Sequence, residues 1–194
     1  MGRQTEEDDN ATAHGSWVLS KAVGRVNGVF KADAGLEIIK TTGSRTDLDW
    51  ASDTVLQKVR LRPSEPVVVL YPWASPETDR DQDYPWTVIK PTVQQIFEHD
   101  AVVIVPAGNY AQGGRRNVDA LPARWASPTF PLIVAGSVSN PGAYSYFTQG
   151  GDRVTAWAPG LEVQCADQGR TFAKRSGTSH STGMVRPSRS KSPY

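Results

Sequence analysis

Residues 101–109 read AVVIVPAGN, an uninterrupted apolar run that ends in a turn sequence. Two further runs of the same kind are PVVVLY at residues 66–71 and PLIVAGSV at residues 131–138. Continuous apolar segments of this length, bounded by proline, are typical of strands that are buried on both faces of a parallel sheet. The three runs therefore predict the centre of such a sheet.

Amphipathic segments separate these runs. Apolar residues recur at helical spacing in residues 52–60 and 88–97, and another helix is expected from about residue 15 to the pair at 27–28, Asn-Gly. Strands that alternate with helices predict right-handed crossovers and a three-layer α/β/α fold with a mainly parallel sheet. Residues 36–39 are expected to form a short strand, and the shorter runs in 144–175 to form edge strands and hairpins.

The composition is that of one globular domain. The 194 residues include 38% hydrophobic residues, 21 Lys and Arg against 20 Asp and Glu, and one cysteine. The balanced charge gives no reason to expect nucleic acid as a partner, and one cysteine cannot form an internal disulfide. No apolar run is long enough for a transmembrane segment, and residues 1–10 lack the apolar core of a signal peptide, so the sequence leaves the localisation unknown. A polar acidic tail at 1–13 and a basic Pro/Ser tail at 186–194 are expected to flank a domain at 14–185.

Three short segments attract attention because a parallel sheet binds its ligands beyond the carboxyl ends of its strands. They are HGS at residues 14–16, PAGN at 106–109 and SGTSHST at 176–182. Each is ordinary by itself, since a histidine at a helix start or a Gly-Thr-Ser triplet often caps a helix and Asn after Gly often belongs to a turn. Together they supply the parts of an acyl-transfer site.

The parts have distinct chemical tasks. Ser179 can offer a hydroxyl for attack and a backbone N–H to a developing oxyanion, His14 can take the hydroxyl proton, and the side-chain amide of Asn109 can be a second oxyanion donor. Gly108 and Gly177 would let a substrate backbone approach without a Cβ in the way.

The same segments resemble the subtilisin-like serine proteases. HGSWVLSKAVGRVNGV from residue 14 is similar to the segment of that family that holds its catalytic histidine, PAGN to its oxyanion segment, and SGTSHSTGMV from residue 176 to its nucleophile segment. The stretch 131–160, which ends in an Ala-Pro-Gly turn, also resembles the family, so the likeness spans about residues 14–185. It implies a subtilisin-like catalytic domain that lacks its first strand and its last helices.

The resemblance implies a serine endopeptidase that acts on a polypeptide substrate and needs no cofactor for its chemistry. In the family's pattern Ser179 is the nucleophile, His14 the general base and acid, and Asn109 the oxyanion donor. The substrate-binding positions that it implies are a pocket wall and a strand edge, with Pro106, Ala107 and Gly108 in the wall and Tyr71 at the edge.

The sequence departs from the family at two places. The family's triad aspartate precedes its histidine at the end of a buried strand, but only 13 residues precede His14, and their only aspartates are Asp8 and Asp9 in a polar stretch. Gly183 stands where the family has proline, four residues after the nucleophile. The alternative function is therefore a non-catalytic pseudoprotease or protease fragment that binds peptide or protein, and a third alternative is an unrelated α/β binding domain.

Three further features have simpler interpretations. Cys165 is expected in a small buried or half-buried site with an ordinary thiol. His180 is expected at the surface or at the rim of the pocket, because adjacent residues on a helix point in different directions. Four acidic residues at alternate positions could hold a structural Ca²⁺, although a solvated loop is favoured; they are Glu77, Asp79, Asp81 and Asp83.

Overall fold

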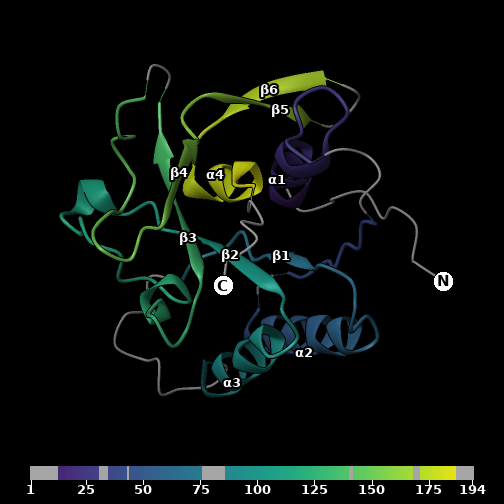
Figure 1. Cartoon of the computed structure of the whole chain (residues 1–194). Coiled ribbons are helices and arrows are strands. Elements are labelled where there is room, and N and C mark those ends of the chain that lie inside the picture. Colours follow the sequence, from purple (N-terminus) through teal and green to yellow (C-terminus); the bar gives the residue numbers. More distant parts are fainter. Residues whose placement is uncertain are drawn as a thin grey trace, which may run out of the picture.

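A computed structural model describes residues 13–30, 35–42, 44–75, 86–139, 142–167 and 171–186. Its centre is a four-stranded parallel sheet with the strand order β1-β2-β3-β4 (Figure 1). The strands are β1 (Val68–Leu70), β2 (Val102–Pro106), β3 (Ile133–Val138) and β4 (Ala156–Pro159). The three apolar runs of the sequence thus form three adjacent parallel strands, as predicted.

Helices cover both faces of the sheet (Figure 1). Helices α2 (Arg45–Arg60) and α3 (Trp86–Phe97) pack together on one face, whereas α4 (Thr178–Met184) lies on the other with α1 (His14–Val23) beside it. An antiparallel hairpin of β5 (Val163–Asp167) and β6 (Thr171–Arg175) lies next to α1. The predicted three-layer α/β fold is confirmed.

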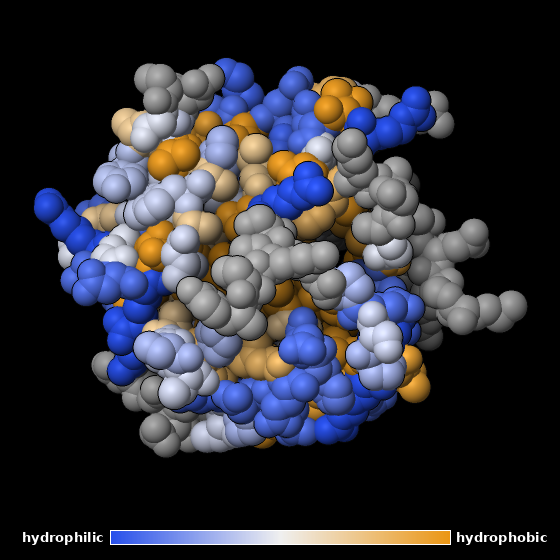
Figure 2. Space-filling view, in the orientation of Figure 1, coloured by the Kyte–Doolittle hydropathy of each residue, from blue (hydrophilic) through white to orange (hydrophobic). Residues whose placement is uncertain are grey.

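Strand β2 belongs to two hydrophobic cores, because successive side chains of a strand point to opposite faces. Val103 and Val105 lie in the larger core with α2 and α3, and Ile104 lies in the smaller one with Ala135 and Ala158 below α4. All three of the β2 side chains are fully buried. Figure 2 shows apolar side chains in the centre of the visible face, with polar side chains around them.

Some elements differ from the sequence-based expectation. Helix α1 ends at Val23 and not near residue 28, because Gly24 closes the last helical hydrogen bond, to the Ser20 carbonyl at 3.1 Å, and then leaves the helical conformation with a ψ of 136°. Residues 36–39 form no strand, and Leu36 and Ile38 are exposed. In the described part of the chain, these residues have no neighbouring strand with which to form backbone hydrogen bonds, so the prediction of a strand at 36–39 was wrong.

Two apolar runs form less strand than expected. Strand β1 covers only the middle of residues 66–71, and Val68 is 37% exposed, so this run is not buried on both faces throughout. Residues 144–147 form no strand beyond one bridge between Tyr144 and Val138. None of the helices in the described ranges is long and apolar enough to cross a membrane.

Candidate active site

The first turn of α4 is held against the carboxyl end of β4. The N–H of Gly177 donates to the Gly160 carbonyl at 2.8 Å, and the Ser181 hydroxyl donates to the Ala158 carbonyl at 3.1 Å. A Cβ at Gly160 would collide with the Ser181 hydroxyl, so glycine in the Ala-Pro-Gly turn allows the helix to begin directly on the strand end. Ser179 is thereby placed beyond the carboxyl ends of the parallel strands, in the first turn of α4.

The side chain of Asn109 is anchored to the residue before Ser179. Its Oδ1 accepts two hydrogen bonds from Thr178, one from the backbone N–H and one from the hydroxyl, each at 2.9 Å. The Thr178 Oγ1 in turn accepts a bond from the N–H of Gly108 at 3.2 Å. Because Oδ1 is engaged in this way, the Asn109 amide nitrogen faces away from Thr178.

The two expected oxyanion donors flank the same small space above Gly177. The point at which a Gly177 Cβ would stand lies 3.6 Å from Asn109 Nδ2 and 3.9 Å from the backbone nitrogen of Ser179. Any side chain at Gly177 would fill that space. The arrangement can therefore offer two N–H groups to one oxygen atom, which is the requirement of an oxyanion hole.

His14 is the first residue of α1 and reaches the same region through the packing of α1 on α4. Its ring centroid lies 6.1 Å from that of His180, the residue after Ser179. The two helices approach closely at Gly183, where a Cβ would lie 2.8 Å from the Val18 carbonyl oxygen. The glycine that replaces the family's proline thus lets α1 pack against α4.

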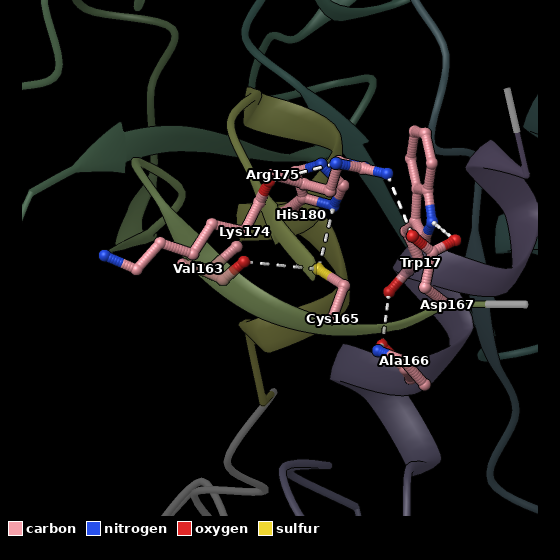
Figure 3. A network of polar contacts seen from close by, with 9 residues as sticks. Trp17, Val163, Cys165, Ala166, Asp167, Lys174, Arg175 and His180 are labelled. Atoms are coloured by element: carbon pink, nitrogen blue, oxygen red, sulfur yellow. Dashed lines mark hydrogen bonds and ion pairs between the residues drawn. The ribbon is translucent and has the colours of Figure 1, made fainter. Parts of the chain in front are cut away.

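His180 is buried, which corrects the expectation of a surface or rim position. It is only 2% exposed, and its Nδ1 lies 3.9 Å from the Sγ of Cys165 on the neighbouring hairpin (Figure 3). Burial, together with the nearby charges of His14, Lys21 and Arg175, lowers the pKa of His180 to about 4. The hairpin covers this side of α4. The side chain of His180, which points away from Ser179, is therefore buried below β5.

Cys165 occupies a fully buried site, as predicted from the sequence. Its Sγ lies 3.6 Å from the Val163 carbonyl oxygen. Burial raises the pKa of the thiol above its usual value. The cysteine is therefore an uncharged packing residue and not an activated nucleophile.

Polar contacts tie the hairpin to α1 (Figure 3). Asp167 accepts one bond from the Trp17 indole at 3.1 Å and another from Arg175 at 3.0 Å. The Arg175 guanidinium also lies 4.0 Å from the centre of the Trp17 ring. The buried Lys21 donates to the Gln164 carbonyl at 2.8 Å, and its burial lowers the pKa of its amine.

The positions expected to bind substrate lie at the ends of β1 and β2. Pro106 ends β2, Ala107 is fully buried, and Gly108 has a φ of 109°, a conformation that favours glycine. The Tyr71 side chain is buried in the larger core, where burial raises the pKa of its hydroxyl to about 12. Its N–H donates to the Ile104 carbonyl at 3.0 Å. The substrate-binding roles of these four residues stay predictions.

Some expected site residues lie outside the described residues. They are Asp8 and Asp9, and the acidic segment with Glu77, Asp79, Asp81 and Asp83. Within the described ranges, no group of three or more His, Cys, Asp or Glu side chains is arranged to hold a metal ion. The expectation of a solvated acidic loop, with Ca²⁺ as the less favoured alternative, is therefore untested.

Comparison with known proteins identifies the fold. No model of a known protein family matches the sequence. Subtilisin from Bacillus pumilus is 28% identical over 99 residues, which are 51% of this chain and 34% of that protein. Subtilisin E from Bacillus subtilis strain 168 has the same identity over 51% of this chain and 25% of that protein. A crystal structure of a cold-adapted subtilisin-like serine proteinase matches with a TM-score of 0.69 at 23% identity, over 88% of this chain and 57% of that chain. The chain carries a domain with the subtilisin-like fold.

A second solved structure leads to the same fold. The subtilisin-like domain matches the prenylagaramide maturation protease PagA with a TM-score of 0.60 at 19% identity, over 88% of this chain and 60% of that chain. The chain spans about a third or less of the length of the two curated subtilisins. The similar proteins are proteases, and the activity of the subtilisin-like domain itself is taken up as a proposal below.

Sequence reasoning missed two residues of the candidate site. Thr178 anchors Asn109, and a signal for it existed, because it directly precedes Ser179 in the quoted nucleophile segment. Gln149 contacts Gly108, but no motif marks it. Its importance depends on contacts with residues more than 29 positions away, which local sequence patterns do not encode.

Proposed function

We propose that the subtilisin-like domain is a serine endopeptidase unit, with Ser179 as the nucleophile, His14 as the general base and Asn109 as an oxyanion donor. The observation that supports this most is the pair of hydrogen bonds from Thr178 to Asn109 Oδ1. They direct the Asn109 amide nitrogen to the space that the Ser179 N–H also borders. Asn109 is exposed, yet both of these half-buried bonds hold its side chain in one orientation.

The proposed reaction is peptide-bond hydrolysis in two stages. The Ser179 Oγ attacks the scissile carbonyl carbon while His14 accepts the hydroxyl proton, and the oxyanion receives bonds from Asn109 Nδ2 and the Ser179 N–H. His14 then gives its proton to the leaving amine, and a water molecule hydrolyses the acyl-enzyme with His14 as base. Because the pKa of His180 is about 4, its ring is neutral at pH 7 and adds no positive charge beside His14.

The competing function is a peptide-binding module in which Ser179 is inert. It would apply if neither Asp8 nor Asp9, which lie outside the described residues, orients the His14 ring. In triad enzymes, loss of the acidic member lowers turnover by about 10⁴-fold but leaves a residual rate. Reactivity of the nucleophile is therefore a more sensitive test of the proposed function than turnover of a substrate.

The test is covalent labelling with a fluorophosphonate probe beside the matched variant Ser179→Ala. We expect labelling of the wild-type protein, none of Ser179→Ala, and labelling slowed by about 10²–10³-fold in Asn109→Ala. Circular dichroism melts of all three proteins show whether they are folded. Absence of labelling in a wild-type protein that melts cooperatively would overturn the proposed peptidase, and saturable binding of a fluorescent peptide by that protein would then support the binding module.

A further inference from the structure

Gln149 is fully buried. Its side chain is enclosed by the loop that follows Asn109. Its Nε2 lies 2.8 Å from the Arg115 carbonyl oxygen, 2.7 Å from the Asn117 carbonyl oxygen and 2.7 Å from Asp119 Oδ1. Three acceptors around one amide nitrogen with two hydrogens fix the orientation of the amide. The loop from residue 109 to residue 119 therefore closes around the end of this one side chain.

The oxygen of the same amide lies beside Gly108. The Gln149 Oε1 has no hydrogen-bond partner within the described part of the chain, and a Cβ at residue 108 would collide with it. The backbone N–H of Gln149 also donates to the Gly108 carbonyl at 3.0 Å. A buried carbonyl oxygen without a donor lowers the stability of the folded protein. The contacts of the Gln149 amide nitrogen and backbone must therefore compensate for this cost.

Gly108 is thus held from two sides. The Gln149 N–H donates to its carbonyl and the Gln149 Oε1 takes up the space that a Cβ would need, while the Thr178 hydroxyl accepts a bond from its N–H at 3.2 Å. Within the described residues, the hydrogen bonds to Oδ1 of the next residue, Asn109, come from Thr178. The direction in which the Asn109 side chain leaves the backbone therefore depends on both anchors of Gly108.

We infer that Gln149 is a positioning residue of the proposed oxyanion hole, acting on Asn109 through Gly108. The inference rests on the proposed function. Donors of an oxyanion hole must stand within hydrogen-bond distance of the position that the oxyanion takes, and a misplacement of about 1 Å can cost about 10²-fold in rate. Gln149 supplies the fixed support that prevents such a misplacement.

The experiment replaces Gln149 by a residue of similar length without polar ends. The variant Gln149→Met is compared with Gln112→Met, which changes an exposed glutamine of the same loop. We expect the fluorophosphonate labelling rate per active site, counted by titration, to fall by about 10- to 100-fold in Gln149→Met and to stay unchanged in Gln112→Met. For a peptide substrate, kcat falls in the same proportion while KM stays within about twofold.

Transition-state and ground-state ligands separate positioning from general structural damage. A peptide boronate, which forms a tetrahedral adduct with the serine, loses affinity in Gln149→Met as the labelling rate falls, whereas the corresponding peptide amide binds as it does to the wild type. A merely structural role would lower the number of folded sites and leave the rate per site unchanged. That outcome would overturn the inference.

A measurement without catalysis keeps the inference separate from the proposed function. The side-chain amide signal of Asn109, assigned in ¹⁵N spectra with Asn109→Asp, is expected to move in Gln149→Met and not in Gln112→Met. If the wild type does not react with the probe, the peptidase proposal fails, and an unmoved Asn109 signal would overturn the inference independently. If Gln149→Met does not fold, Asp119→Asn, which keeps an acceptor for Nε2, must produce a smaller change of the Asn109 signal, and no change would again overturn the inference.

Discussion

Thr178 joins the segments of the candidate site through one hydroxyl and one N–H. It is fully buried, donates twice to Asn109 and accepts from Gly108. A hydroxyl can donate one proton and accept through its lone pairs, so both side-chain bonds are satisfied at once. Its position in the first turn of α4 links the placement of Asn109 to that of Ser179, the next residue.

The variant Thr178→Val tests this link. Valine has the shape of threonine but leaves the Gly108 N–H unpaired, so we expect a loss of about 1–3 kcal/mol in the free energy of unfolding and labelling of Ser179 slowed by about tenfold. Urea denaturation and fluorophosphonate kinetics measure the two effects. The matched control is Thr182→Val, because the Thr182 hydroxyl bonds only to the Thr178 carbonyl within the described residues. Equal slowing in both variants would contradict a specific role of Thr178.

The lowered pKa of His180 makes the stability of the fold depend on pH. Its pKa falls from 6.5 in the unfolded chain to about 4 in the folded protein. Between these values the unfolded state binds a proton that the folded state does not, so stability decreases as the pH falls from 6.5 to about 4 and this contribution is constant above and below that window. The full loss is at most about 3 kcal/mol.

The comparison variant for this prediction is His180→Gln, which cannot titrate. Urea denaturation at pH 7 and at pH 4.5 is expected to show a larger loss of unfolding free energy in the wild type than in His180→Gln. The difference between the two proteins isolates this histidine from the carboxylates that titrate in the same range. A wild type that loses no more than the variant would show that His180 is not held neutral by the fold.

Among the secondary-structure elements, the pair α1 and α4 has the largest consequence for the site, because α1 carries His14 and α4 carries Ser179. The two helices are in close contact at Gly183. A Cβ there would lie 2.8 Å from the Val18 carbonyl oxygen and 3.3 Å from the Lys21 Cβ. Backbone atoms cannot yield as a flexible side chain can, so the helices would have to move apart.

The variant Gly183→Ala is therefore expected to be destabilised and slow. Overpacking typically costs about 1–3 kcal/mol, which exceeds the gain of up to about 1 kcal/mol from the better helix propensity of alanine. Thermal melts measure the stability, and fluorophosphonate labelling should slow because His14 moves relative to Ser179. Gly113→Ala is the control, since a Cβ at Gly113 would meet no atom within 4 Å. A Gly183→Ala protein with wild-type stability would refute the close contact.

The elements also show how far the sequence alone can lead. The runs around Val103 and Val134 were predicted correctly, because a strand buried on both faces must be apolar at every position. Leu36 and Ile38 have the same local character but are exposed, since a strand needs a partner that local sequence does not specify. His180 was misjudged for a related reason. Helical geometry gives the direction of its side chain, but only the fold reveals that β5 lies there.

In the candidate site, too, local sequence patterns indicate some residues and not others. Ser179, His14 and Asn109 could be proposed because their segments have recognisable order and composition. Gln149 could not, because its role depends on loop residues 108–119 that meet it only in the folded chain. Contacts that are distant in sequence and carried by single side chains leave no periodic pattern.

For the molecule as a whole, β2 couples the two helical layers. Its alternate side chains enter both cores, so neither layer can lose its packing without exposing one face of the same strand. Three tryptophans lie in or against the larger core, with Trp73 stacked near Trp86 and Trp86 near Trp125. Cys165, the one cysteine of the chain, belongs to β5 of the hairpin, which lies on the opposite side of the sheet (Figure 1), and its side chain is buried.

We expect tryptophan fluorescence and the exposure of Cys165 to report a single cooperative unfolding transition. In urea, the midpoint of the tryptophan fluorescence change should coincide with that of Cys165 exposure, measured by pulsed reaction with a thiol reagent, because the layers unfold together. The variant Ile104→Ala, which opens a cavity in the smaller core, should lower both midpoints equally and reduce the free energy of unfolding by about 2–5 kcal/mol. A midpoint that moves only for Cys165 would mean that the α1–α4 layer unfolds independently of the sheet, and the site would then lose its geometry before the fold is lost.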